Sequence, residues 1–191
     1  MLTAGIHSAF TEGVSRLSSH HAVSKIGCGA GGNGADPALF TTSADAFQDH
    51  AELSEEVFGA SSMVVRCKNL DELLSVVEGL EGQLTAAIHM TDADSEAARR
   101  LLPVLEEKVG RILVNGFGTG VEVCHAMVHG GPFPATSDSR TSSVGSLAIK
   151  RFLRPVAYQD LPDALRPESL REKNPLGTAR LVNGRIQLPQ T

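Results

Sequence analysis

The sequence contains no tryptophan, a single tyrosine and only three cysteines in 191 residues. The cysteines, Cys28, Cys67 and Cys124, are odd in number and show no CxxC spacing. This pattern favours reduced thiols over a disulfide framework. The first residues carry neither a basic stretch nor an apolar run that would indicate a secretory leader. We therefore expect a cytoplasmic protein.

Blocks of basic residues and long apolar runs are also lacking. Seventeen Lys and Arg residues stand against 22 Asp and Glu residues, which gives a net charge of −5. Nucleic-acid binding is not expected, because no basic cluster is present to neutralise phosphates. Membrane spanning is not expected either, since no run approaches the roughly 18 apolar residues that a spanning helix requires. The length suits one ordinary domain, or one domain with an added arm.

Apolar strands alternate with amphipathic helices in the middle of the chain. Short connections between them imply parallel strands and helical crossovers, so we predict an α/β fold with part of a doubly wound parallel sheet. The apolar core of the first strand, Met63 to Val65, predicts burial on both faces. The expected elements are strands at 62–67, 83–90 and 112–114 and helices at 70–80, capped by Asn69, and 92–108, capped by Asp92 and closed by Gly110.

The flanking regions give weaker patterns. Before residue 54 we predict an amphipathic helix at 3–17, strands at 22–28 and 37–42, and a helical turn capped by Ser43. The glycines from Gly27 to Gly34 are too irregular to match GxGxxG, which favours a surface loop over a phosphate site. Near the C-terminus we predict a short helix at 142–148, a strand at 149–159, an extended tail at 160–177, and a type I′ hairpin around Asn183-Gly184.

The stretch from Arg111 to Asp138 is the first candidate site, because a strand that runs into a long Gly-rich loop is where open α/β sheets place ligands. His125 and His129 have helical spacing, but the glutamate of H-E-x-x-H and a clear third ligand are missing, so no metal site is predicted. Cys124 lies in a plausible cleft without a neighbour that would lower its pKa. No cysteine is nominated as a nucleophile.

A second candidate is Ser54-Glu55-Glu56-Val57-Phe58-Gly59, which places two adjacent carboxylates before a strand. One interpretation is a capped, solvated turn. The other is that one glutamate faces a cleft and accepts hydrogen bonds from sugar hydroxyls, while Phe58 lies against a ring. Spacing alone leaves both open.

This second segment resembles the E-E-[IV]-F-G-P motif of the NAD(P)-dependent aldehyde dehydrogenase superfamily. VNGFGTGVEVCHAMVHGGPFPATSDSRTSSVG followed by RFLRPVAYQDLPDAL is similar to its α-ketoglutaric semialdehyde dehydrogenase branch. The resemblance covers essentially the whole chain and implies a C-terminal portion. Residues 1–148 would be the later part of the catalytic domain, and 149–191 an oligomerisation strand, tail and terminal hairpin. Ala60 and Gly118 depart from the family pattern, which has proline at both places.

The resemblance also implies roles for particular residues. Glu56 would hold the nicotinamide ribose of NAD or NADP, and Phe58 would pack near the nicotinamide. A homo-oligomer would form through the strand Ile149 to Tyr158. The wall of the aldehyde tunnel would be formed by Phe117, Thr119, Gly120, Val121 and His129.

In the family, a nucleophilic cysteine, a general-base glutamate and an oxyanion asparagine precede the region that matches Met1. The resemblance therefore implies a portion of an enzyme that oxidises a semialdehyde to the carboxylic acid, with no catalytic residue of its own and no activity alone. Two alternatives stay open. One is a binding or regulatory module that kept the fold without catalysis. The other is a small complete enzyme that uses Cys124 with His125 or His129.

Overall fold

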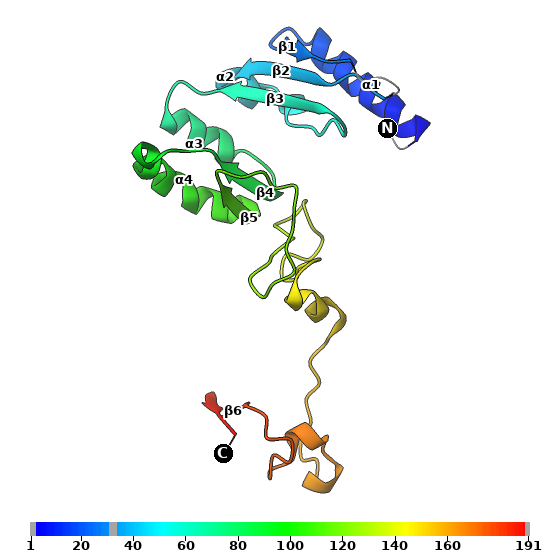
Figure 1. The fold of residues 1–191 in the computed structure, drawn as a ribbon, viewed down its shortest axis with the longest axis vertical. Coiled ribbons are helices and arrows are strands. Elements are labelled where there is room, and N and C mark those ends of the chain that lie inside the picture. The colour runs from blue at the N-terminus through cyan, green and yellow to red at the C-terminus, as the bar shows by residue number, and fades with distance from the viewer. Residues whose placement is uncertain (1–2, 31–33, 190–191) are drawn as a thin grey trace. The chain divides into compact units, whose positions relative to one another are not determined.

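The computed structural model describes residues 3–30 and 34–189. Two compact units can be distinguished, with the division between Arg151 and Phe152. Figure 1 shows the elements of each unit, and the two are described separately. None of the helices in the described residues is both long enough and apolar enough to cross a membrane.

The first unit begins with a helix that packs on a three-stranded sheet (Figure 1). Helix α1, Ala4–Ser19, starts at Thr3, whose hydroxyl accepts a hydrogen bond from the Ile6 N–H and so satisfies one of the free amides of the first turn. The predicted apolar stripe is confirmed at two of its positions, since Phe10 and Leu17 are buried. Leu17 joins Ala38, Phe40 and Leu53 in the core.

In this sheet, strands β1, Ser24–Cys28, and β2, Ala38–Ser43, are antiparallel, whereas β3, Ser61–Arg66, runs parallel to β2. The prediction that this last strand is buried on both faces was wrong: half-buried and exposed residues alternate along it. One face of β3 therefore lies outside the core. Part of the predicted glycine loop, residues 31–33, lies outside the described residues.

Short helical segments connect β2 to β3. Helix α2, Ala44–Asp49, is capped by Ser43 as predicted, because the Ser43 hydroxyl accepts a hydrogen bond from the Ala46 N–H. A 3₁₀ turn, η1, follows at Ala51–Leu53 and buries Leu53 in the core. The turn ends at Ser54, directly before the two adjacent glutamates.

The second sheet of the unit has two parallel strands. Helix α3, Leu70–Glu78, begins at Asn69, whose side chain accepts a hydrogen bond from the Glu72 N–H. Strand β4, Gln83–Ile88, pairs in parallel with β5, Val109–Val114, and helix α4, Ser95–Lys108, connects them. The α/β class with parallel strands is confirmed. The three predicted strands do not share one sheet, however, because β3 pairs with β2 rather than with β4.

The ends of α4 also differ from the prediction. A 3₁₀ turn, η2, at Asp92–Asp94 precedes the helix, and Thr91 rather than Asp92 forms the capping box, with Asp94 as its partner. At the other end, Gly110 does not close the helix but is the second residue of β5. The helix is continuous through Pro103.

Beyond β5 the first unit has little regular structure. The predicted short helix at 142–148 and the start of the predicted strand at Ile149 are replaced by one 3₁₀ helix, η3, Ser146–Phe152. From Leu153 to Tyr158 the backbone forms no strand. The prediction of a strand was wrong for the isolated chain, because a strand requires a neighbour for its N–H and C=O groups and no described residue provides one here.

The second unit contains two 3₁₀ turns and a hairpin. The turns η4, Asp163–Leu165, and η5, Glu168–Leu170, replace the predicted extended tail. They arise from a repeated pattern, PDALR and PESLR, in which each arginine Nε donates to a carbonyl five residues earlier. The predicted hairpin is confirmed by β6, Arg180–Val182, and β7, Arg185–Gln187, with both Asn183 and Gly184 at positive φ.

Candidate functional site

The segment Glu55 to Phe58 lies in the connection from η1 to β3. Its side chains have different surroundings. Glu55 forms an ion pair with Arg16 of α1, with 3.0 Å between Nη1 and Oε2. Val57 packs closely against α1, since a Cβ added at Gly13 would lie 2.7 Å from its Cγ1. Phe58 is 68% exposed. The segment is thus fixed to α1 through Glu55 and Val57, while the Phe58 ring faces outward.

Two hollows adjoin this segment. One of about 460 Å³ is bounded by Glu56 and Phe58 together with Ser61, Ser62 and Met63 of β3. The other, of about 590 Å³, lies between the segment and one side of α1. Two carboxylates, Glu55 and Glu56, line the first hollow with hydroxyl groups and an aromatic face, and this combination suits a ligand that has both hydroxyl groups and a flat ring.

The second candidate loop begins where β5 ends at Val114. Asn115 has a φ of 53°, in the left-handed region that asparagine tolerates. Its side-chain amide donates to the Met90 carbonyl at 2.9 Å and accepts from the Met90 N–H at 2.8 Å. Asn115 therefore continues the β4–β5 pairing with its side chain while its backbone turns the chain into the loop.

Arg111 of β5 holds the loop that follows. Its Nη2 donates to the Gly118 carbonyl and its Nη1 to the Gly120 carbonyl, both at 2.8 Å. The Nε atom of the same guanidinium is buried and has no hydrogen-bond partner among the described residues. Two carbonyls fixed by one planar guanidinium give the loop a defined path over the sheet.

The four loop residues nominated from the sequence are exposed on this path. Thr119, Gly120 and Val121 are exposed, and the Phe117 ring is 80% exposed. The Phe117 ring lies 5.2 Å from the His89 imidazole, measured between centroids. These four residues form one side of a surface at the carboxyl ends of β4 and β5, the edge at which parallel sheets bind ligands.

His129, the fifth nominated residue, lies in a different place. Its backbone N–H donates to the Ser142 hydroxyl at 3.0 Å, and its carbonyl accepts from the Ser143 hydroxyl at 2.9 Å. It lines a cavity of about 260 Å³ that contains none of the four loop residues. Its Nδ1 atom is buried and has no hydrogen-bond partner among the described residues.

The cavity beside His129 also contains charged side chains, Asp138 and Arg151. Hydrogen bonds from the Arg140 side chain and backbone lower the pKa of the Asp138 carboxyl below its ordinary value, and the charges of Arg140 and Arg151 act in the same direction. Asp138 is therefore an ionised carboxylate at neutral pH. The cavity can receive a small polar group.

The cysteines and the pair His125 and His129 are the other side chains that could be reactive or bind a metal. All three cysteines are free thiols. Burial, together with the nearby charge of Glu72, raises the pKa of the Cys67 thiol, which disfavours the thiolate. Among the described residues, His125 and His129 share no three-ligand group that could hold a metal ion.

Comparisons with known proteins agree with the resemblance in the sequence. The chain is 54% identical over 195 aligned residues to α-ketoglutaric semialdehyde dehydrogenase 2 of Azospirillum brasilense, covering 98% of the chain. It is 45% identical over 188 aligned residues to α-ketoglutaric semialdehyde dehydrogenase of Acinetobacter baylyi, covering 96% of the chain. The resemblance to the aldehyde dehydrogenase superfamily is confirmed. The chain spans 36% of the length of each of these relatives.

Solved structures with low sequence identity share the fold of the chain. Δ¹-pyrroline-5-carboxylate dehydrogenase of Mycobacterium tuberculosis, determined with NAD, matches 87% of the chain and 31% of its own length, with a TM-score of 0.62 and 19% identity. Proline utilization A of Bdellovibrio bacteriovorus matches 82% of the chain and 15% of its own length, with a TM-score of 0.65 and 24% identity. No protein-family model matches the chain.

One group of side chains was missed from the sequence. His20, His50 and Glu52 converge although some thirty residues separate the first from the others, and their ligand atoms all lie within 4.8 Å of one another. The local signals were the pair His20-His21 at the end of a predicted helix and the spacing of two between His50 and Glu52. Neither signal shows that the two segments meet.

Proposed function

We propose that the chain forms part of an NAD(P)-dependent aldehyde dehydrogenase that oxidises α-ketoglutaric semialdehyde to the carboxylic acid. The observation that carries the proposal is the identity of 54% and 45% to two α-ketoglutaric semialdehyde dehydrogenases over nearly the whole chain. The nucleophilic cysteine, the general base and the oxyanion donor belong to other parts of the enzyme. The chain contributes to the cofactor site and to the wall of the aldehyde pocket.

Glu56 and Phe58 would contact the cofactor, which accepts the hydride when bound. Glu55 is already paired with Arg16, and this supports Glu56 as the carboxylate that accepts hydrogen bonds from the ribose hydroxyls. The exposed Phe58 ring beside the same hollow offers an apolar face to the nicotinamide. The relative from M. tuberculosis, with the same fold, was determined with NAD.

On the substrate side, Phe117, Thr119, Gly120 and Val121 would form the wall of the aldehyde pocket. The hydrogen bonds from Arg111 to this loop support a fixed wall, since they hold two of its carbonyls. His129 would add to the lining of the pocket, and its position in a cavity supports that role. Arg151, which lines the same cavity, supplies a positive charge that would attract the carboxylate of a dioxo acid.

The segment Ile149 to Tyr158 would pair with another subunit of a homo-oligomer. Its apolar side chains support this role: Ile149, Leu153, Val156 and Tyr158 are all exposed in the single chain. Exposed apolar side chains that recur along one segment of the chain are typical of a strand that pairs with a partner. The three free thiols are consistent with a location in the cytoplasm.

A chimera tests the proposed function. The matching segment of the A. brasilense relative is replaced by this chain, and NADH formation from α-ketoglutaric semialdehyde is followed by absorbance. We expect the chimera to be active and the 191-residue chain alone to be inactive. Turnover by the isolated chain would contradict the proposed division of roles. A chimera that assembles but oxidises no aldehyde would instead favour a binding or regulatory module.

Within the active chimera, Glu56→Gln is expected to lower kcat/KM for NAD by about 10- to 100-fold, because a charge-assisted hydrogen bond is worth about 1.5–3 kcal/mol. Glu55→Gln is the matched control, since it removes a neighbouring carboxylate that faces Arg16. Steady-state kinetics with varied NAD measure both variants. Equal losses for the two substitutions would show that Glu56 has no special contact with the cofactor.

A further inference from the structure

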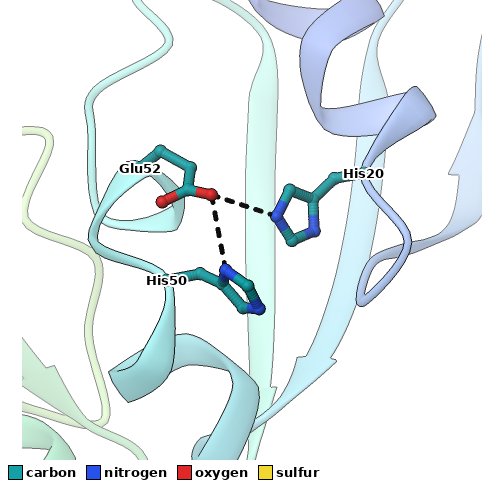
Figure 2. Close-up of side chains that lie close together, drawn as sticks. All are labelled: His20, His50 and Glu52. Carbon is teal, nitrogen blue, oxygen red and sulfur yellow. Dashed lines mark hydrogen bonds and ion pairs between the residues drawn. The ribbon is translucent and has the colours of Figure 1, made fainter.

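Three potential metal ligands meet on the surface of the first unit (Figure 2). His20 follows the last turn of α1, His50 follows the last residue of α2, and Glu52 lies in η1. Glu52 Oε1 lies 3.2 Å from His20 Nε2 and 3.4 Å from His50 Nδ1. Figure 2 shows the carboxylate oxygen directed toward both imidazole rings.

The spacing of these atoms suits a transition-metal ion. Zinc binds nitrogen and oxygen ligands at about 2.0–2.2 Å, so neighbouring ligand atoms of a tetrahedral site are about 3.4 Å apart. Both distances to Glu52 Oε1 agree with this spacing. Imidazole favours zinc, nickel and copper, whereas magnesium and calcium favour oxygen ligands. We propose that His20, His50 and Glu52 bind a divalent transition-metal ion of the zinc type, with water completing the coordination.

The surrounding structure already holds the ligands near their positions. The His20 and His21 rings stack with centroids 4.7 Å apart, and the His50 ring lies edge-on to them at 4.8 and 5.1 Å. Buried Leu17 fixes the end of α1, and buried Leu53 fixes the turn that carries Glu52. Little side-chain freedom is lost on binding, because the side chains are already packed together.

The hydrogen bonds of His20 show which ring nitrogen carries the proton before a metal binds. The Ala22 N–H donates to His20 Nδ1 at 3.2 Å, so the neutral ring carries its proton on Nε2 and donates it to Glu52. When Nε2 binds the metal, the proton moves to Nδ1 and the bond from Ala22 is lost. His50 must likewise have no proton on Nδ1 for that atom to bind the metal. Metal binding is therefore predicted to disturb the amide of Ala22, which is not itself a ligand.

Calorimetric titration of the tag-free chain with zinc, after the three cysteines have been alkylated, tests the site. We expect one equivalent to bind, and we expect His50→Gln and Glu52→Gln each to weaken binding by about tenfold or more. His7→Gln is the matched control, because this exposed histidine of α1 lies outside the group. Magnesium should not compete. Equal zinc affinity in the wild type and the double variant His50→Gln/Glu52→Gln would overturn the proposal.

A second measurement separates loss of a ligand from loss of fold. In ¹⁵N-labelled protein, zinc should shift the amide resonance of Ala22 and the imidazole nitrogens of His20 and His50. The control signals are those of His89, which lies in another part of the unit and contacts Phe117. Unmoved Ala22 and His20 signals at saturating zinc, in a protein whose spectrum is otherwise that of the folded chain, would place the ion elsewhere.

Discussion

Replacing Phe40 by alanine is expected to lower the free energy of unfolding of the first unit by about 3–5 kcal/mol. The Phe40 side chain is fully buried at the centre of the first sheet, where Leu17 of α1 and Leu53 of η1 belong to the same cluster. The loss combines the transfer of the ring with the cavity that remains, and it is large beside a total stability of about 5–15 kcal/mol. Urea denaturation followed by circular dichroism measures it.

The neighbouring residue offers a matched control for this prediction. Leu39 lies on the same strand but points to the opposite face and is partly exposed. Leu39→Ala is expected to cost about 1 kcal/mol. Comparable losses for the two substitutions would contradict a core centred on Phe40. Leu17 closely precedes His20 in the chain, and Leu53 directly follows Glu52. Both leucines belong to the core cluster of Phe40, so Phe40→Ala should also weaken zinc binding, whereas Leu39→Ala should not.

Local signals in the sequence predicted most elements of the fold. Ser43 and Asn69 were predicted as capping residues, and their side chains accept hydrogen bonds from nearby amides at the start of a helix. Asn183-Gly184 predicted the terminal hairpin because few other pairs accept positive φ at both positions. These features depend on contacts within a few residues, so the sequence alone was sufficient.

The predictions that failed depended on a distant neighbour. The apolar run in β3 indicated burial on both faces, but burial depends on what covers a sheet, and one face of this strand is exposed. Alternation from Ile149 onward indicated a strand, yet the single chain provides no strand to pair with it. Gly110 was taken for a helix end because glycine is common there. In the structure, Gly110 instead lies in close contact with the backbone of Gly130, twenty residues later in the chain.

The candidate site was predictable only where a family motif supplied the missing information. Two adjacent glutamates and a phenylalanine fit a solvated turn as well as a cofactor site, and the resemblance to aldehyde dehydrogenases favoured Glu56. The structure adds the ion pair of Glu55 with Arg16, which distinguishes the two carboxylates. No motif joins His20 to His50 and Glu52. Their convergence follows from the packing of α1 and η1 around Phe40.

Gly110→Ala is expected to destabilise the first unit by about 1–3 kcal/mol or more, because it introduces a methyl group where two backbone segments meet. A Cβ at position 110 would collide with the Gly130 carbonyl and lie 3.0 Å from the Gly131 nitrogen. Backbone atoms cannot rotate away as a flexible side chain can. The segment that follows His129 must therefore move off the sheet or the unit must lose stability.

Gly116→Ala is the control for this substitution, since its nearest neighbour would be the Val114 carbonyl oxygen at 3.9 Å, which is ordinary contact. It should leave the free energy of unfolding unchanged or raise it by up to about 1 kcal/mol, because alanine lowers the conformational entropy of the unfolded chain. Urea midpoints compare the two variants, and hydrogen exchange of the His129 amide reports the local effect, because that amide donates to Ser142. Gly110→Ala should accelerate this exchange. Slow exchange and an unchanged midpoint in that variant would show that His129 is positioned independently of the contact between Gly110 and Gly130.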